Sequence, residues 1–224
     1  MEYEAKRTFK DAIYGQFSRI GKVLANPHRL ELIDVLAQGP RSVEALAGET
    51  ALTVANASQH LQVLRRARLV RRQKEGTYVY YRLAGDEVVR LWQALRAVGE
   101  ARLADIDRIV RDYRMVPEVL DPIGMEALRE RIDRGDVIVL DVRPAEEYHH
   151  GHIAGARSIP VGELEARLDE LPTDVDVVAY CRGPYCVFAD EAVDALRERG
   201  VDARRLKAGF PDWKAAGLPV ETTG

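Results

Sequence analysis

Both cysteines of the chain lie in one short segment, residues 179–186, with the sequence AYCRGPYC. Cys181 and Cys186 are five positions apart. The residues between them are Arg182, Gly183, Pro184 and Tyr185. Two thiols at this spacing can form a disulfide, supply half of a metal site, or act as a nucleophile and its helper. The elements on either side of the segment decide between these possibilities.

Cys181 ends an apolar run, and a helical pattern follows Cys186. The run VDVVAYC, residues 175–181, is typical of a buried parallel strand. Open α/β sheets bind ligands beyond the carboxyl ends of their strands, which is where Cys181 stands. Gly183 permits a tight loop around the sulfur, and the positive end of the following helix favours the thiolate. Cys181 is therefore a candidate nucleophile; the alternative is a small buried residue at a strand end.

The rest of the second half alternates helices with strands. GMEALRERIDRG, residues 124–135, predicts a helix that ends at Gly135. DVIVLDV, residues 136–142, is a second buried parallel strand, and VDARRLKAG, residues 201–209, predicts a short one. The expected fold class of this half is an α/β domain with a mostly parallel sheet.

This half resembles the rhodanese family over residues 123–221. LDVRPAEEYHHGHIAGARSIP carries that family's Asp-x-Arg, Glu-Tyr and Gly-His-Ile-x-Gly-Ala signatures, and LKAGFPDWKAAGLPVE is similar to its closing Gly-x-x-x-Trp segment. The resemblance implies that Cys181 accepts sulfane sulfur as a persulfide. It also implies that Arg182 helps to hold an anionic sulfur donor, and that Asp141 and Arg143 are scaffold residues beside the loop.

Two residues of the loop depart from the rhodanese pattern. Many rhodaneses carry a basic residue at the last loop position, where this chain has Cys186, and Pro184 removes one backbone donor. Both changes should weaken turnover on thiosulfate, while Cys186 adds a resolving thiol. Val187 stands six positions after Cys181, so the phosphatase signature Cys-x5-Arg is absent.

A zinc site is the alternative interpretation of three nearby histidines. These are His149, His150 and His152. They fall inside a motif that is structural in rhodaneses, so we expect no metal there and no cofactor elsewhere.

The first half has the pattern of a helix-turn-helix. Asn26, Ser42 and Thr53 are candidate N-caps for three helices in NPHRLELIDVLAQGP, RSVEALAGET and LTVANASQHLQVLRRARLV. The last of these is polar outside, and the residues expected to face inward are Val54, Ala57, Leu61 and Leu64. Two short helices joined by a tight turn, the second polar outside, are typical of a DNA-binding motif.

A basic hairpin follows the helix-turn-helix. LVRRQKEGTYVYYRL, residues 69–83, alternates around Gly76, and residues 65–74 hold six basic residues in ten. A charge run can be merely a solvated surface. A basic hairpin directly after a helix-turn-helix is typical of a wing. A wing would place Arg71, Arg72 and Lys74 where DNA phosphates would lie.

The segment SQHLQVLRRARLVRRQKEGTYVYYRL resembles the winged helix-turn-helix of the ArsR family of bacterial repressors. The match covers roughly residues 10–110. It implies a mainly α domain whose recognition helix turns five residues toward the DNA groove: Thr53, Asn56, Ser58, Gln59 and His60. For His60 the alternative is a helix-surface histidine that packs on its neighbours.

The same resemblance implies a homodimer. The first helix, with its apolar stripe Phe9, Ile13, Phe17, Ile20 and Leu24, and a long helix at residues 86–112 would form the interface. The alternative is that the long helix packs only within its own monomer. Two recognition helices one DNA turn apart would bind an inverted repeat in a double-stranded operator.

Direct metal sensing by the first half is not expected. Arsenic-sensing members of the ArsR family bind metal through cysteines, and this chain has no cysteine before residue 181. His28 and His60 alone do not make a thiophilic site. The signal must therefore enter elsewhere.

Composition is consistent with two domains. The chain has 224 residues, 46% hydrophobic and 31% charged. Residues 1–112 hold 19 Lys and Arg against 14 Asp and Glu, whereas residues 113–224 hold 14 against 22. This asymmetry indicates different partners for the two halves. We predict a DNA-binding and dimerisation domain at 1–112, a proline-containing linker at 113–122, and a rhodanese-like domain at 123–224.

The sequence also bears on where the protein works. No apolar run approaches the roughly 18 residues that a membrane span needs, and the start lacks the apolar segment of a signal peptide. Two cysteines do not form the disulfide framework of a secreted protein. We therefore expect a cytoplasmic protein without a membrane partner.

Three hypotheses follow. The first is a repressor whose rhodanese domain senses or delivers reactive sulfur, supplied as polysulfide, persulfide or thiosulfate. The second is a sulfurtransferase that also binds DNA, and the third is a repressor whose rhodanese domain is only a docking module. The intact DNA-binding pattern disfavours the second hypothesis, and the intact Cys181 loop disfavours the third.

Overall fold

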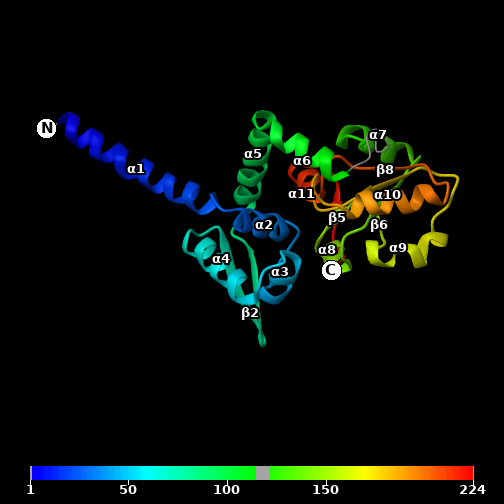
Figure 1. Cartoon of the computed structure of the whole chain (residues 1–224), viewed down its shortest axis with the longest axis horizontal. Coiled ribbons are helices and arrows are strands. Elements are labelled where there is room, and N and C mark those ends of the chain that lie inside the picture. Colours follow the sequence, from blue (N-terminus) through cyan, green and yellow to red (C-terminus); the bar gives the residue numbers. More distant parts are fainter. Residues whose placement is uncertain (1, 115–121, 224) are drawn as a thin grey trace. The chain divides into compact units, whose positions relative to one another are not determined.

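The chain folds into two compact units, Met1–Trp92 and Gln93–Gly224 (Figure 1). The computed structural model describes residues 2–114 and 122–223. The linker predicted at 113–122 falls mostly on residues 115–121, which lie outside the described residues. Within the described residues, no helix combines the length and the apolar character that crossing a membrane requires.

The first unit is mainly helical, with a small antiparallel sheet. Its elements are α1 (Glu2–Leu24), α2 (Pro27–Leu36), β1 (Arg41–Ser42), α3 (Val43–Glu49), α4 (Val54–Arg66), β2 (Val70–Glu75), β3 (Tyr78–Leu83) and the start of α5 (Asp86–Arg102). The sheet order is β1-β3-β2. Strand β1 was not predicted; it is two residues long and pairs with β3 at Tyr80 and Tyr81.

The predicted caps of α2, α3 and α4 are confirmed. The side chains of Asn26, Ser42 and Thr53 each accept a hydrogen bond from a backbone N–H three residues later. The inward face of α4 is confirmed for Ala57, Leu61 and Leu64, which are completely buried. The prediction was wrong for Val54, which is 46% exposed. Val54 is the first residue of the helix, and the buried stripe starts one turn later.

The basic hairpin forms the predicted wing. Strands β2 and β3 pair antiparallel from Val70 with Leu83 to Glu75 with Tyr78. Gly76 lies in the turn with φ +61°, a conformation that side chains disfavour. Figure 1 shows the hairpin extending away from the helices of its unit.

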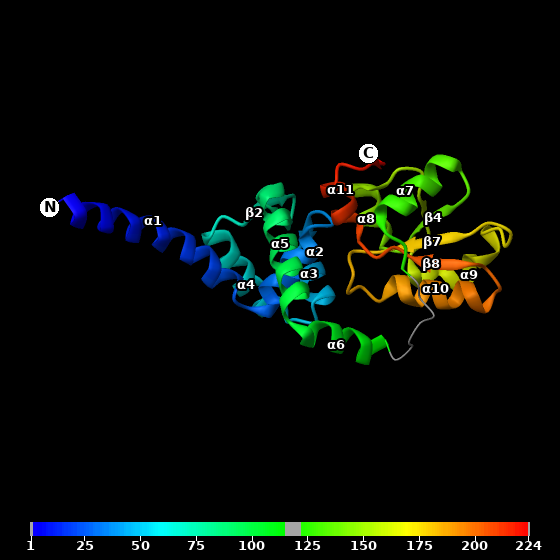
Figure 2. The same cartoon turned by 90° about the horizontal axis from the view of Figure 1, so that it is seen from above.

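Helix α1 extends away from the rest of the first unit in both Figure 1 and Figure 2. Three residues of its predicted stripe, Phe9, Ile13 and Phe17, are exposed in the single chain. Ile20 instead packs against the core of the unit. The outer part of the stripe is therefore an apolar surface that the unit itself does not cover.

The long helix predicted at 86–112 is two helices. Helix α5 ends at Arg102, and α6 (Ala104–Arg114) follows after a break at Leu103. The prediction of one continuous helix was wrong because α6 folds back onto Gly99. A Cβ at Gly99 would lie 3.2 Å from Ile106 Cδ1, so the missing side chain makes room for this contact.

The second unit is a four-stranded parallel sheet between two layers of helices. Its sheet order is β6-β4-β7-β8. After α6, the elements are α7 (Met125–Arg134), β4 (Ile138–Asp141), α8 (Ala145–His150), β5 (His152–Ile153), β6 (Arg157–Ser158), α9 (Val161–Arg167), a 3₁₀ turn (Leu168–Glu170), β7 (Val177–Tyr180), α10 (Phe188–Glu198), β8 (Ala203–Arg205), α11 (Phe210–Ala215) and β9 (Val220–Glu221). Strands β5 and β9 form a separate antiparallel pair.

Alternation along β7 separates two apolar cores. Val177, Ala179 and Cys181 belong to the core beneath α9 and α10. Val178 and Tyr180 belong to the core on the other face, with residues of α7 and α11. Figure 2 shows these helices on opposite sides of the sheet. Because successive side chains of a strand point to opposite faces, the position of Cys181 fixes the face on which it lies.

The buried stripe of α4 gives a stability prediction for the first unit. We expect Leu61→Ala to lower the free energy of unfolding by about 2–5 kcal/mol because it leaves a cavity in a closed core. Val54→Ala on the same helix should change it by less than about 0.5 kcal/mol because Val54 is exposed. Hydrogen exchange on the full chain measures each unit separately. Equal losses of protection in α4 for both variants would contradict this description of the core.

Candidate functional site

Cys181 and Cys186 form a disulfide that closes the predicted loop. Cys181 is 2% exposed and directly follows β7, and α10 begins at Phe188, two residues after Cys186. Cys186 packs against the same core as Cys181. The Cα atoms of the two cysteines are 6.3 Å apart. Of the three possibilities raised by the spacing, the structure contains the disulfide.

The loop contacts the start of α11 and the residue before it, Gly209. Phe210 N donates to Cys181 O at 3.1 Å, and within the loop Cys186 N donates to Gly183 O at 3.2 Å. A Cβ at Gly209 would lie 2.1 Å from Arg182 O and 2.4 Å from Gly183 N. Only glycine lets the backbone approach the loop this closely. Gly209 is the glycine of the Gly-x-x-x-Trp segment, and no local sequence pattern indicates this close approach to the loop.

Arg182 is paired with a buried carboxylate. Its Nη2 lies 2.5 Å from Glu147 Oε1, and its Nε also donates to Glu147 at 2.9 Å. The Glu147 side chain is completely buried, so this pair balances the charge inside the protein. Sequence reasoning missed Glu147, although the Glu-Tyr signature contains it. A role of Arg182 toward an anionic donor stays a prediction.

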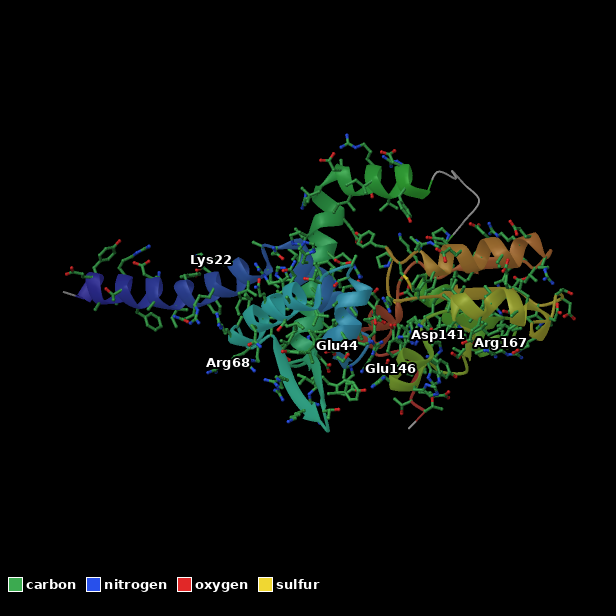
Figure 3. All side chains as sticks on the ribbon, turned by 60° about the horizontal axis from the view of Figure 1, so that its bottom comes forward. Lys22, Glu44, Arg68, Asp141, Glu146 and Arg167 are labelled. Carbon is green, nitrogen blue, oxygen red and sulfur yellow. A yellow bond between two sulfur atoms is a disulfide. The ribbon has the colours of Figure 1, made fainter. Side chains whose placement is uncertain are left out.

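Asp141 and Arg143 form a buried ion pair on the sheet face opposite Cys181. Both side chains are completely buried, and Arg143 Nη2 lies 2.6 Å from Asp141 Oδ2. Arg143 also donates to Gly151 O at 2.7 Å, and the Tyr180 hydroxyl donates to Asp141. Burial raises the pKa of Tyr180 well above its ordinary value of 10, and the Asp141 carboxylate acts in the same direction. Figure 3 labels Asp141 among the side chains of this unit.

The candidate DNA-binding residues of α4 differ in exposure. Asn56 and Gln59 are exposed, whereas Ser58 and His60 are half-buried. Thr53 is also exposed, and its hydroxyl already accepts from Asn56 N at 3.2 Å. Asn56 and Gln59 are therefore the side chains of this set that are most open to a DNA groove.

The surroundings of His60 favour its neutral imidazole. Its ring centroid lies 5.5 Å from that of His28. Partial burial lowers the pKa of His60 below its ordinary value of 6.5, and His28 and Arg29 act in the same direction. A neutral imidazole can donate one hydrogen bond and accept another at a base or a phosphate, but it adds no positive charge. The basic residues Arg71, Arg72 and Lys74 are exposed on β2.

Two of the three histidines of the second unit contact the backbone, and the third, His149, lies edge-on to the Tyr148 ring. His150 Nδ1 lies 2.7 Å from Glu146 O, and His152 Nδ1 lies 2.9 Å from Tyr148 O. The His152 ring also stacks on Tyr148. Across residues 2–114 and 122–223, no three His, Cys, Asp or Glu side chains are grouped so that they could hold a metal ion.

Two family models match the chain. Residues 24–73 match a helix-turn-helix domain, and residues 125–216 match a rhodanese-like domain. The chain is 46% identical to the HTH-type transcriptional regulator Rv0324 of Mycobacterium tuberculosis over 212 residues, which cover 95% of this chain and 93% of that protein. It is 32% identical to a sulfurtransferase of Allochromatium vinosum over 104 residues, 46% of this chain and 95% of that protein.

One similar solved structure is the homodimeric winged helix-turn-helix DNA-binding domain Mb0332 of Mycobacterium bovis, a possible ArsR-family regulator. It is 45% identical to this chain, covers 42% of it and 87% of its own length, and has a TM-score of 0.40.

The buried ion pair behind the loop gives a second stability prediction. We expect Asp141→Ala to lower the free energy of unfolding of the second unit by about 3–5 kcal/mol because Arg143 loses its carboxylate inside the protein. The matched control is Asp169→Ala, which removes an exposed ion pair to Arg199 and should change stability by about 0–1 kcal/mol. Urea denaturation of the full chain measures both. Similar values for the two variants would show that the buried pair is not a scaffold.

Proposed function

Because this chain belongs to the HTH-type transcriptional regulators in which an ArsR-like winged helix-turn-helix domain precedes a rhodanese-like domain, we propose that sulfur-dependent bonding between Cys181 and Cys186 controls its binding to operator DNA. The chain is a DNA-binding transcriptional regulator. The proposal adds that it acts as a repressor and that its rhodanese-like domain receives the signal.

The observation that carries this proposal is the disulfide itself. The resemblance to rhodaneses implies that Cys181 accepts the sulfur as a persulfide, and Cys186, the second cysteine of the chain, is disulfide-bonded to it. A housekeeping transferase needs a loop that releases sulfur to an acceptor. A loop whose last residue is a second thiol offers an intramolecular reaction instead, which suits a sensor.

The proposed reaction has two steps. The Cys181 thiolate attacks the outer sulfur of a hydropersulfide, RSSH; the new bond gives Cys181–S–SH, and RS⁻ leaves as a thiol after taking up a proton. The Cys186 thiolate then attacks the inner sulfur, forming the Cys181–Cys186 disulfide and releasing HS⁻. Two thiols are oxidised to a disulfide, and one sulfane sulfur is reduced to sulfide, so no other oxidant is needed.

The DNA half supports operator binding by a homodimer. The uncovered apolar residues of α1 fit a second copy of the chain, and Asn56 and Gln59 face outward on α4. A dimer would offer two such helices to an inverted repeat. The wing residues Arg71, Arg72 and Lys74 would add phosphate contacts that do not depend on sequence.

Sulfurtransfer is the second candidate activity. The similarity to a protein named as a sulfurtransferase favours it, and so does the position of Cys181 at the end of β7. The pairing of Arg182 with Glu147 and the presence of Cys186 disfavour fast turnover of thiosulfate. A thiosulfate–cyanide assay run beside a DNA shift assay, with and without polysulfide, distinguishes a sensor from a transferase.

The reaction predicts different products for two variants. After polysulfide treatment, mass spectrometry should find the disulfide in the wild type and a stable persulfide on Cys181 in Cys186→Ser, because the resolving thiol is missing. Cys181→Ser should take up no sulfur and should keep its fold. Cys186→Ser should bind DNA but lose the wild-type response to sulfur.

Two results would refute these roles. Sulfur uptake at the wild-type level in Cys181→Ser would show that Cys181 is not the acceptor. A normal operator response in Cys186→Ser would show that Cys186 is not the partner thiol.

The DNA face predicts two classes of substitution. Gln59→Ala should reduce the preference for operator over random DNA by about 1–3 kcal/mol, because a base contact is lost. Arg72→Ala and Lys74→Ala should weaken binding to every sequence and lower the dependence of affinity on salt. Fluorescence anisotropy with operator and random DNA at several salt concentrations measures both effects. Equal losses on the two DNAs for Gln59→Ala would exclude a base contact.

A further inference from the structure

The disulfide loop contacts the last turns of α5. Tyr185 directly precedes Cys186, and its hydroxyl donates to Glu100 Oε1 at 2.7 Å. Arg96 lies one turn earlier on α5 and forms an ion pair with Glu100 at 3.7 Å. A Cβ at Gly183 would lie 3.7 Å from Arg96 Nη1. Glu100 is therefore hydrogen-bonded to the loop that holds both cysteines, and Arg96, one turn earlier, lines the same cavity as Pro184 and Tyr185 of that loop.

Helix α5 is also bonded to the first turn of α11, which contacts the loop. Arg96 Nη2 and Gln93 Nε2 donate to Asp212 Oδ1 at 2.6 Å and 3.0 Å. The other oxygen of Asp212 accepts from Gly209 N at 3.0 Å, and Gly209 is the residue whose backbone lies against Arg182 and Gly183. Helix α5 is thus bonded to the loop itself through Tyr185 and to the start of α11 through Asp212.

The disulfide restricts the residue that makes the direct bond. Tyr185 lies inside the covalent ring that Cys181 and Cys186 close. A cavity of about 580 Å³ lies beside it, and its lining includes Tyr185, Glu100 and Arg96. Opening the ring gives the loop backbone freedom that the closed ring denies it, and the cavity offers the Tyr185 side chain room to leave Glu100.

The Tyr185 hydroxyl is a donor throughout the neutral pH range. Burial raises the pKa of Tyr185, and the Glu100 carboxylate raises it further. The hydroxyl therefore keeps its proton, and its bond to an ionised carboxylate belongs to the stronger class of hydrogen bonds.

Helix α5 begins inside the DNA-binding unit. Val88, in its first turn, is buried in the core of that unit, and Trp92 Nε1 donates to Asp34 Oδ1 on α2 at 2.7 Å. The residues from Gln93 onward belong to the second unit. A continuous helix fixed at one end by buried contacts can carry a displacement of its other end, because rigid elements transmit coupling between sites.

We propose that Tyr185, Glu100 and Arg96 are positioning residues through which α5 transmits the state of the Cys181–Cys186 pair to the DNA-binding unit. This inference rests on the proposed sulfur response and names the side chains that connect it to DNA. The Tyr185–Glu100 bond is made when the ring is closed and weakens when the ring opens. Arg96 keeps α5 against the loop in both states through Asp212.

The test compares DNA affinities of the two states of the full-length protein. Each variant is reduced with dithiothreitol or closed with polysulfide, and mass spectrometry counts the disulfides. Anisotropy then gives Kd for a DNA duplex selected from a random pool by the reduced wild type. The ratio of the two Kd values measures the coupling, and a ratio of about fivefold or more is expected for the wild type.

Tyr185→Phe removes one hydroxyl and keeps the ring. It should form the disulfide in wild-type yield and bind DNA with wild-type affinity when reduced, but its Kd ratio should fall to within about twofold of unity. Glu100→Gln should give an intermediate ratio, because a neutral amide accepts a weaker hydrogen bond than a carboxylate. The control is Tyr113→Phe on α6, where the side chain is 70% exposed, and it should keep the wild-type ratio.

The outcomes separate the two proposals. A wild-type ratio in Tyr185→Phe would overturn the role of α5 contacts and leave the sulfur response standing. A ratio of one in the wild type would overturn the sulfur response and its transmission together. Loss of coupling in Tyr113→Phe as well would show that the effect is not specific to the loop.

Discussion

The second unit depends on the alternation of side chains at the carboxyl end of β7. Tyr180 points to one face of the sheet, where its hydroxyl donates to Asp141, and Asp141 holds the buried Arg143. Cys181 points to the other face, beneath α10. The end of β7 is therefore held by a buried network on the sheet face opposite Cys181, in which Tyr180, Asp141 and Arg143 are joined by hydrogen bonds and an ion pair. The backbone after Cys181 leaves the strand and forms the loop. The network thus fixes the end of the strand from which the loop with both cysteines begins.

Sequence reasoning recovered the elements whose signals are local. The caps at Asn26, Ser42 and Thr53, the turn at Gly76 and the apolar runs of β4 and β7 were correct because each depends on a few neighbouring residues. It failed at the α5–α6 break. Apolar residues recur at helical spacing on both sides of Leu103, with the stripe interrupted at Gly99 and Arg102. The contact between Gly99 and Ile106 forms only in the folded helices.

The same distinction applies to the site. Cys181 and its loop followed from the strand, the glycine and the helix around them. Glu147 and Asp212 did not, because their partners Arg182 and Arg96 are distant in sequence and nothing in the local pattern pairs them. Gly209 was noted only as part of a signature, since its role is a close approach to the backbone of Arg182. Contacts between segments that are distant in the sequence determine how the loop is held. Which residues form these contacts cannot be predicted from local patterns in a single sequence.

Cys186 explains why a rhodanese-like loop would serve a regulator better than a transferase. A basic residue at that position would attract an anionic donor and leave the persulfide free for an external acceptor. A thiol there competes with any acceptor from inside the loop, where its effective concentration is far higher than that of a dissolved thiol. In the proposed reaction the persulfide would therefore be short-lived, and the lasting product would be the closed ring that contains Tyr185. A disulfide that persists after the sulfur donor has been consumed does not favour catalytic turnover. It would, however, give a lasting change in the loop to which α5 is bonded through Tyr185.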